Sequence, residues 1–315
     1  MRIKFLLSLL LLPLAVGAAE HPVSLDVGGG TLYGTELLPD GVPAGARVPV
    51  VVLHAGSGPT DRDGNSKLLP GPNDSLRMLA EGLARHGIAS VRYDKRAIGS
   101  SALPVWKEEN LRFDDYIGDA VAWLRKLRAD GRFSKVVMAG HSEGAQIAEE
   151  ACALGGADGC VLIAGAGHPL DEILREQLRE QLPPPLMMES DRILASLKAG
   201  KPVDRVPPPL MSLYHASVQP YLISVFQHDP RTAIAALKMP VLIVQGTSDI
   251  QVKEDEAKTL AAAAPGARLV IVDGMNHVLK MVGTDDALQQ KSYASPDLPV
   301  APQLIDAVSS FVDGR

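Results

Sequence analysis

Aromatic residues are few in this sequence, and clusters of positive charge are absent. Phe, Trp and Tyr make up 4% of the 315 residues, and no Lys/Arg-rich run occurs in a chain whose formal net charge is −6. Proteins that bind nucleic acids depend on clustered positive charge, so we expect no nucleic-acid partner. Because 46% of the residues are hydrophobic and 22% are charged, disordered and fibrous proteins are also excluded.

Cysteine is rarer still, with two residues in the whole chain, Cys152 and Cys160. Their spacing is not C-x-x-C, and neither adjoins a histidine in the sequence, so we assign them no chemistry. A local disulfide and a pair of buried free thiols are both open alternatives. The histidines show no metal-ligand spacing either. We therefore expect no metal and no cofactor.

Long apolar runs are absent except at the N-terminus. There, two basic residues precede an apolar stretch over residues 5–16, and small residues follow. This pattern predicts a signal peptide over residues 1–19, cleaved after Ala18 or Ala19. The run is shorter than the roughly 20 residues that span a bilayer, so an uncleaved membrane anchor is the weaker alternative. We expect an exported protein, periplasmic or secreted, without stable membrane insertion after cleavage.

The rest of the chain alternates apolar β-branched runs with helical patterns. A hairpin is expected over residues 23–38, followed by strands at 48–53, 89–93, 136–139, 160–164, 241–245 and 269–272. Helices are expected between them at 75–86, 116–129, 143–153, 255–264 and 303–312. Strands that are apolar on both faces belong to a covered sheet, and alternation with helices makes that sheet mostly parallel. The fold class is therefore α/β, with a doubly wound sheet.

One segment, from about residue 167 to residue 236, interrupts this alternation. It has no convincing strand, and its helical patterns are separated by two runs of three prolines. Long excursions from an α/β sheet tend to carry substrate contacts. We therefore predict one domain over residues 20–315, with a helical cap insertion at about 167–236. The alternative is a surface elaboration that only extends the core.

The segment Gly140-His141-Ser142-Glu143-Gly144 follows a predicted strand and opens the next helix. In that position G-x-S-x-G predicts a nucleophile elbow, a sharp turn that lifts the serine hydroxyl clear of the sheet. A serine hydroxyl is a weak nucleophile and needs a base that a carboxylate orients. Ser142 is thus the candidate nucleophile.

The candidate acid and base follow Ser142 in the order that this architecture requires. Asp249 and His277 come directly after the last two predicted strands, and His277 is the only histidine beyond the insertion. Asp171, after an earlier strand, is the alternative acid. Asp273 is expected to serve its own loop instead.

The oxyanion hole is expected to use two backbone N–H groups. One belongs to Glu143, the residue after the nucleophile, and the other to the loop at residues 54–59. Ser57 is the first choice in that loop and Gly56 the next. Glycines there allow the chain to fold back and point an N–H at the reacting oxygen.

Several stretches together resemble the α/β-hydrolase superfamily, and within it a group of serine hydrolases with the motif G-S-G-P-T-D-R-D-G-N. That motif occupies residues 56–65 here. Residues 93–101 resemble Y-D-K-R-G-x-G-x-S, with Ala97 in place of a glycine, residues 140–144 match G-H-S-E-G, and residues 245–249 resemble the group's acid loop. The resemblance implies an α/β-hydrolase fold and a Ser-His-Asp mechanism, in a group of esterases and serine aminopeptidase-like proteins.

These observations favour an exported serine hydrolase that cleaves carboxylic esters through an acyl-enzyme. Its partner would be a small-molecule ester or a short peptide. An aminopeptidase-like hydrolase with the same triad is one alternative, and an inward carboxylate in the insertion would favour it. A catalytically silent binding protein on the same scaffold is the other alternative.

Overall fold

The computed structural model describes residues 19–102 and 107–315. Residues 1–18 of the predicted signal peptide therefore lie outside the described residues. At the centre is an eight-stranded sheet with the strand order β1-β2-β4-β3-β5-β6-β7-β8. The first two strands pair antiparallel with each other, β2 pairs antiparallel with β4, and the pairings from β4 to β8 are parallel.

The strands lie close to the positions expected from the sequence. They are β1 (Glu20–Val27), β2 (Gly30–Leu37), β3 (Val48–His54), β4 (Ala89–Tyr93), β5 (Phe133–His141), β6 (Gly159–Ile163), β7 (Val241–Gly246) and β8 (Arg268–Val272). The strand expected at 136–139 begins earlier, at Phe133, which is buried and pairs with Val48. The polar residues Ser134 and Lys135 interrupt its apolar pattern, which conceals this start in the sequence.

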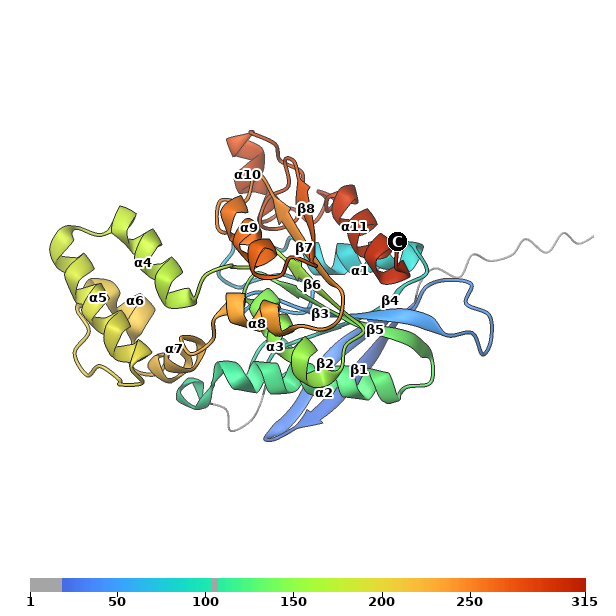
Figure 1. The fold of residues 1–315 in the computed structure, drawn as a ribbon, viewed down its shortest axis with the longest axis horizontal. Helices are drawn as coiled ribbons and strands as arrows, with labels where there is room; N and C mark the ends of the chain where they lie inside the picture. Colours follow the sequence, from blue (N-terminus) through green and yellow to red (C-terminus); the bar gives the residue numbers. More distant parts are fainter. Residues whose placement is uncertain (1–18, 103–106) are drawn as a thin grey trace, which may run out of the picture.

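Helices cover both faces of the sheet, which gives three layers (Figure 1). One face packs against α1 (Ser75–Arg85) and α11 (Pro302–Asp313), and the other against α2 (Phe113–Ala129), α3 (Glu143–Gly155) and α9 (Glu254–Ala263). Alternate residues of a strand point to opposite faces, so Val52 belongs to one hydrophobic core and Leu53 to the other. The chain also contains η1 (Glu108–Asn110) and the helix α10 (Asp286–Ser292), which the sequence did not predict.

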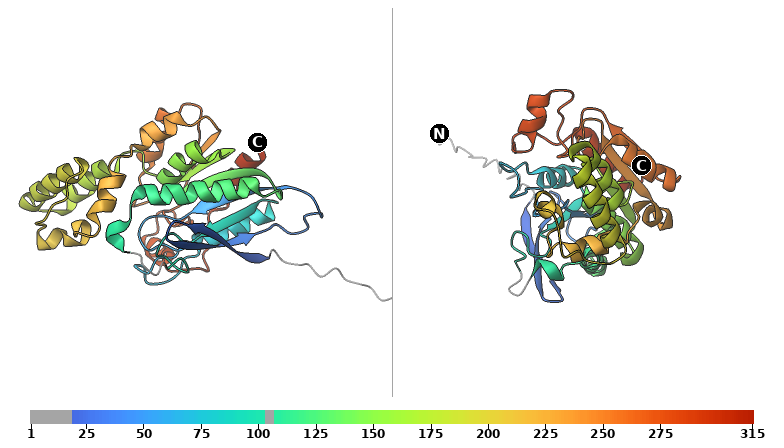
Figure 2. Two further views of the ribbon diagram at one scale, coloured as in Figure 1. Left: turned by 90° about the horizontal axis from the view of Figure 1, so that it is seen from below. Right: turned by 90° about the vertical axis from the view of Figure 1, so that its left-hand side faces the viewer.

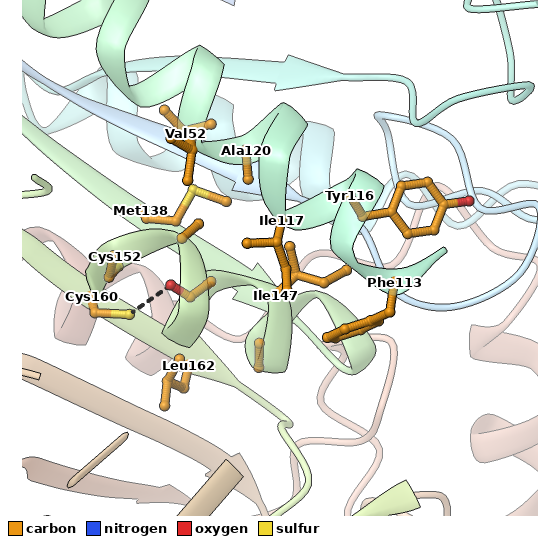
Figure 3. Close-up of a cluster of buried hydrophobic side chains, with 14 of the residues drawn as sticks. Val52, Phe113, Tyr116, Ile117, Ala120, Met138, Ile147, Cys152, Cys160 and Leu162 are labelled. Atoms are coloured by element: carbon orange, nitrogen blue, oxygen red, sulfur yellow. Dashed lines mark hydrogen bonds between the residues drawn. The ribbon is translucent and has the colours of Figure 1, made fainter. Parts of the chain in front are cut away.

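Cys152, on α3, and Cys160, on β6, lie in one hydrophobic core, as Figure 3 shows. Cys152 and Cys160 are buried free thiols, and the sulfur of Cys160 donates to the carbonyl oxygen of Ala148 at 3.7 Å. Of the two alternatives left open by the sequence, this structure has the free thiols.

The insertion between β6 and β7 is helical. Residues 167–236 are all described and contain no strand; their helices are α4 (Leu170–Gln181), α5 (Pro184–Lys198), η2 (Pro208–Leu210), α6 (Met211–Tyr214), α7 (Gln219–Val225) and α8 (Pro230–Ala236). Helices α4, α5 and α6 stand beyond one end of the sheet, whereas α7 packs on α2 and α8 on α3 (Figures 1 and 2). In the part of the chain that the structure describes, no helix has the length and apolar character to cross a membrane.

Candidate active site

The turn between β5 and α3 is a single residue, Ser142, with φ 57° and ψ −124°. This strained conformation depends on the glycines at either side. A Cβ on Gly140 would lie 1.8 Å from the carbonyl oxygen of Gly144, and a Cβ on Gly144 would lie 2.6 Å from that of His54. The elbow that projects the hydroxyl from the sheet edge therefore requires glycine at both positions.

The three residues predicted as nucleophile, base and acid lie in one hydrogen-bonded chain. Nε2 of His277 is 3.1 Å from Oγ of Ser142, and Nδ1 of His277 is 2.8 Å from Oδ2 of Asp249. A carboxylate only accepts, so Nδ1 carries the proton and Nε2 is free to accept one from the hydroxyl. The arrangement can deprotonate the serine as it attacks a carbonyl carbon.

Asp249 is held in its ionised form by several donors. Its Oδ1 accepts the backbone N–H groups of Gln251 and Val252 at 2.8 and 2.9 Å, and Oδ2 also accepts from Nε2 of Gln245 at 3.2 Å. Burial acts to raise the pKa of Asp249, but the hydrogen bond and charge of His277, with the two backbone donors, outweigh it and lower the pKa. The carboxylate is thus ready to stabilise a charged imidazole.

The loop that carries His277 is fixed by a buried asparagine that the sequence analysis missed. Asn276 donates from Nδ2 to Oε1 of Gln289 at 2.9 Å and to Oγ of Ser292 at 2.7 Å, both on α10. Leu279, at φ 65°, closes the loop by donating its N–H to the carbonyl oxygen of Asn276. Adjacency to the base is the only signal of Asn276 in the sequence, because its partners come from a short helix without apolar periodicity.

The alternative acid, Asp171, lies elsewhere. It lies in the first turn of α4, and its Oδ1 accepts from Nζ of Lys198 at 2.6 Å, an ion pair within the insertion. Asp273 accepts from Oγ1 of Thr247 at 3.0 Å, so its carboxylate binds the loop after β7 and not, as the sequence had led us to expect, its own loop. Asp249 is therefore the carboxylate that the structure brings to His277.

The two expected oxyanion-hole residues both border a hollow beside Ser142. Neither the N–H of Ser57 nor that of Glu143 has an acceptor among the described residues. The Glu143 N–H is free because it opens a helix, where the first N–H groups have no intrahelical partner. The loop of Ser57 approaches closely, since a Cβ on Gly56 would lie 3.1 Å from Cβ of Ser142.

This hollow has a volume of about 180 Å³, and the insertion supplies one of its walls. It is lined by Ser57, Ser142, Glu143, Gln146, Ala166, His168, Leu170, Ile173, Gln177, Gln251 and Val252. Helix α7 also reaches the elbow, because the Tyr221 hydroxyl donates to Oε1 of Glu143 at 2.8 Å. The α4 side chains facing the hollow are uncharged, but Glu176 and Glu180 line an adjoining hollow of about 70 Å³ that also borders Ile173 and Gln177.

Groups of His, Cys, Asp and Glu that could hold a metal ion are not found within residues 19–102 and 107–315.

Comparison with known families and curated relatives finds a similarity of each kind. Residues 74–281 match the model of the family described as serine aminopeptidase, S33. Esterase EstD of Thermotoga maritima is 30% identical to this chain over 238 residues, which are 73% of this chain and 54% of EstD. The chain thus spans about half the length of this curated relative.

Solved structures show the same fold at low sequence identity. Est1E from Butyrivibrio proteoclasticus has a TM-score of 0.59 and 16% identity, over 93% of this chain and 98% of that one. The α/β hydrolase GrgF from Penicillium sp. sh18 has a TM-score of 0.54 and 18% identity, over 82% and 91%. These likenesses concern the fold alone, and they confirm the α/β-hydrolase fold that the sequence predicts.

Proposed function

This chain belongs to the serine aminopeptidase S33 family of α/β hydrolases, and we propose that it is an exported enzyme that hydrolyses carboxylic esters with Ser142, His277 and Asp249. The observation that carries the proposal is the pair of hydrogen bonds from Asp249 through His277 to Ser142. The similarity to EstD, which is named an esterase, supports esters as the substrate class. The N-terminal pattern of basic, apolar and small residues supports export.

In the proposed reaction, Oγ of Ser142 attacks the ester carbonyl carbon while Nε2 of His277 accepts its proton. The carbonyl oxygen becomes negative and is stabilised by the N–H groups of Ser57 and Glu143. Collapse of this intermediate breaks the bond to the alcohol, which takes the proton from His277 and leaves an acyl group on Ser142. Water then attacks the acyl-enzyme by the same steps and releases the acid.

Asp249 contributes by stabilising the imidazolium that forms when His277 takes the proton. The carboxylate also fixes the tautomer of the imidazole, and in the serine-protease template its replacement by an amide, which leaves the wrong tautomer, costs about 10⁴ in kcat. No cofactor takes part in these steps, since every proton and bond is accounted for by the triad, the ester and water.

The decisive experiment is labelling of the purified mature protein with a fluorophosphonate probe. We expect one label, on Ser142, and no labelling of Ser142→Ala, with activity on a small activated ester lost in parallel. Ser134→Ala changes an exposed serine of β5 and is the matched control. Labelling of folded Ser142→Ala at another serine would refute the assignment, and N-terminal sequencing of the exported protein tests cleavage after Ala18 or Ala19.

A second candidate function is removal of an amino-terminal residue from a short peptide by the same triad. Glu176 and Glu180 favour it, because these exposed residues line the hollow next to that of Ser142 and a carboxylate there would attract a protonated amine. Matched panels of simple esters and aminoacyl anilides separate the two functions. Faster hydrolysis of the anilides, abolished by Glu176→Gln with Glu180→Gln, would assign the peptidase activity.

A further inference from the structure

A buried lysine, Lys95, holds the loop that carries Ser57. Its Nζ donates to the carbonyl oxygen of Gly56, and to that of Gly58 at 3.1 Å. Lys95 follows the end of β4, which is the parallel neighbour of β3, so the side chain reaches the loop that continues from β3. Its side chain is only 1% exposed. It belongs to the stretch 93–101, which resembles the motif Y-D-K-R-G-x-G-x-S.

The contact with Gly56 determines where the N–H of Ser57 points. The Gly56 carbonyl and the Ser57 N–H belong to one peptide unit, which is planar and trans, so the two groups point in opposite directions. When Lys95 binds the carbonyl oxygen, the N–H is directed away from Lys95. Ser57 borders the hollow at Ser142, and its N–H has no acceptor among the residues that the structure describes.

The same contact strengthens the N–H as a donor. A hydrogen bond to the carbonyl of a peptide polarises that peptide, and the effect is larger when the donor is charged and water is excluded. Burying an ammonium group is costly, and no carboxylate of the described chain lies within ion-pair distance of Lys95. Burial lowers the pKa of Lys95 to about 8, against the opposing charge of Glu143. The Tyr116 ring, 5.6 Å from Nζ, provides a further weak attraction.

We propose that Lys95 is a positioning residue of the oxyanion hole, which fixes and polarises the Gly56–Ser57 peptide so that its N–H stabilises the negative oxygen. This inference rests on the proposed ester hydrolysis. It assigns to Lys95 an effect on the transition state and not on the bound substrate, because the carbonyl oxygen gains its charge only during the attack.

The test compares Lys95→Met and Lys95→Gln with the wild type on a short activated ester. We expect Lys95→Met to lower kcat about 100-fold, the cost of losing an oxyanion-hole donor, while KM changes by less than about threefold. Affinity for a trifluoromethyl ketone, which forms a charged tetrahedral adduct on the serine, should fall by the same factor as kcat/KM. Lys95→Gln keeps an uncharged N–H donor, so its kcat should fall between those of the wild type and Lys95→Met.

Arg96→Met is the matched control, because it removes a cation from the adjacent residue. Arg96 pairs with Asp119 at 2.7 Å and does not contact the oxyanion loop. We expect its kcat to stay within about threefold of the wild type, in keeping with a role outside the reacting centre.

Three results would overturn the inference: a folded Lys95→Met with wild-type kcat, a loss confined to KM, or unchanged affinity for the ketone. If Lys95→Met does not fold, the same comparison on Lys95→Gln decides. Failure of the proposed function gives a different result, since the wild-type protein would then neither hydrolyse the ester nor be labelled at Ser142.

Discussion

Nε2 of His141 lies 2.8 Å from the main-chain carbonyl oxygen of His277, so the residue before the nucleophile holds the loop of the base. The centroids of the two imidazole rings are 4.9 Å apart. Burial, with the neighbouring His277, lowers the pKa of His141 to about 3, against the hydrogen bond to the carbonyl. His141 is therefore neutral at ordinary pH, and its Nε2 must carry the hydrogen that the carbonyl accepts.

Replacing His141 tests this link between elbow and base. His141→Leu leaves a buried carbonyl without its donor, which costs about 1–3 kcal/mol, and we expect kcat to fall about tenfold or more as His277 shifts. His141→Gln keeps an N–H donor and should retain most of the activity. Steady-state kinetics on one ester measures both, and equal activities for the two variants would contradict the prediction.

Two aspartates that could each orient the base from their sequence positions can now be separated by experiment. Asp249→Asn should lower kcat by about 10⁴, because the imidazole is then held in the wrong tautomer. Asp171→Asn should keep most of its activity, since Asp171 pairs with Lys198 and not with His277. The reverse ranking of the two kcat values would identify Asp171, and not Asp249, as the carboxylate that orients His277.

Glu149 makes the stability of the fold depend on pH. Its carboxyl group is fully buried on α3 without a hydrogen-bond partner in the described chain, and burial, followed by the nearby Cys160, raises its pKa well above 4.5. The folded protein then keeps the proton that the unfolded chain loses, so the folded state becomes less favoured as pH rises above about 4.5, the unfolded value.

Glu149→Leu should therefore stabilise the protein, by little at pH 4 and by more at pH 8. Urea unfolding at both pH values measures the difference. The exposed Glu176→Gln is the control and should show no such pH dependence. A gain of equal size at both pH values would mean that the pKa of Glu149 is not raised in the folded protein.

Ile173 of α4 lines the hollow of about 180 Å³ beside Ser142, so we expect its side chain to limit the length of the acyl group that fits there. Ile173→Trp fills part of that space, and we expect its kcat/KM for octanoate esters to fall at least tenfold relative to acetate esters, because each misplaced methylene costs about 1–3 kcal/mol. Ile173→Ala should shift the preference the other way. A series of p-nitrophenyl esters measures both, and an unchanged preference in both variants would exclude α4 as a wall of the substrate site.

The sequence predicted those parts of the site that depend on local pattern. Gly140 and Gly144 flank Ser142 between a strand and a helix, and this local context identifies the elbow without any distant contact. The order of the later strands then led to Asp249 and His277. Such reasoning works because the carboxyl ends of parallel strands meet at one edge.

The contacts that the sequence did not predict join segments without a shared pattern. Asn276 binds Gln289 and Ser292 of α10, a helix of seven mostly polar residues that no periodicity identifies. Lys95 lies within a recognised motif, but the carbonyl groups that it binds belong to a loop 37 and 39 positions away. Because every residue has a main-chain carbonyl, the residue types in that loop do not reveal which carbonyl accepts the hydrogen bond. Only the folded arrangement reveals these partners.

The hydrogen bond between His277 and Ser142 joins residues 135 positions apart, and the loop of Ser57 precedes both. The reacting groups therefore meet only after β3, β5, β7 and the loop beyond β8 have been assembled. Contacts between distant parts of a chain form slowly, because a long stretch of backbone must first be ordered. A chain still emerging from the ribosome can contain an intact elbow and yet be chemically inert. In refolding, recovery of hydrolysis should follow the slowest phase and report completion of the whole sheet.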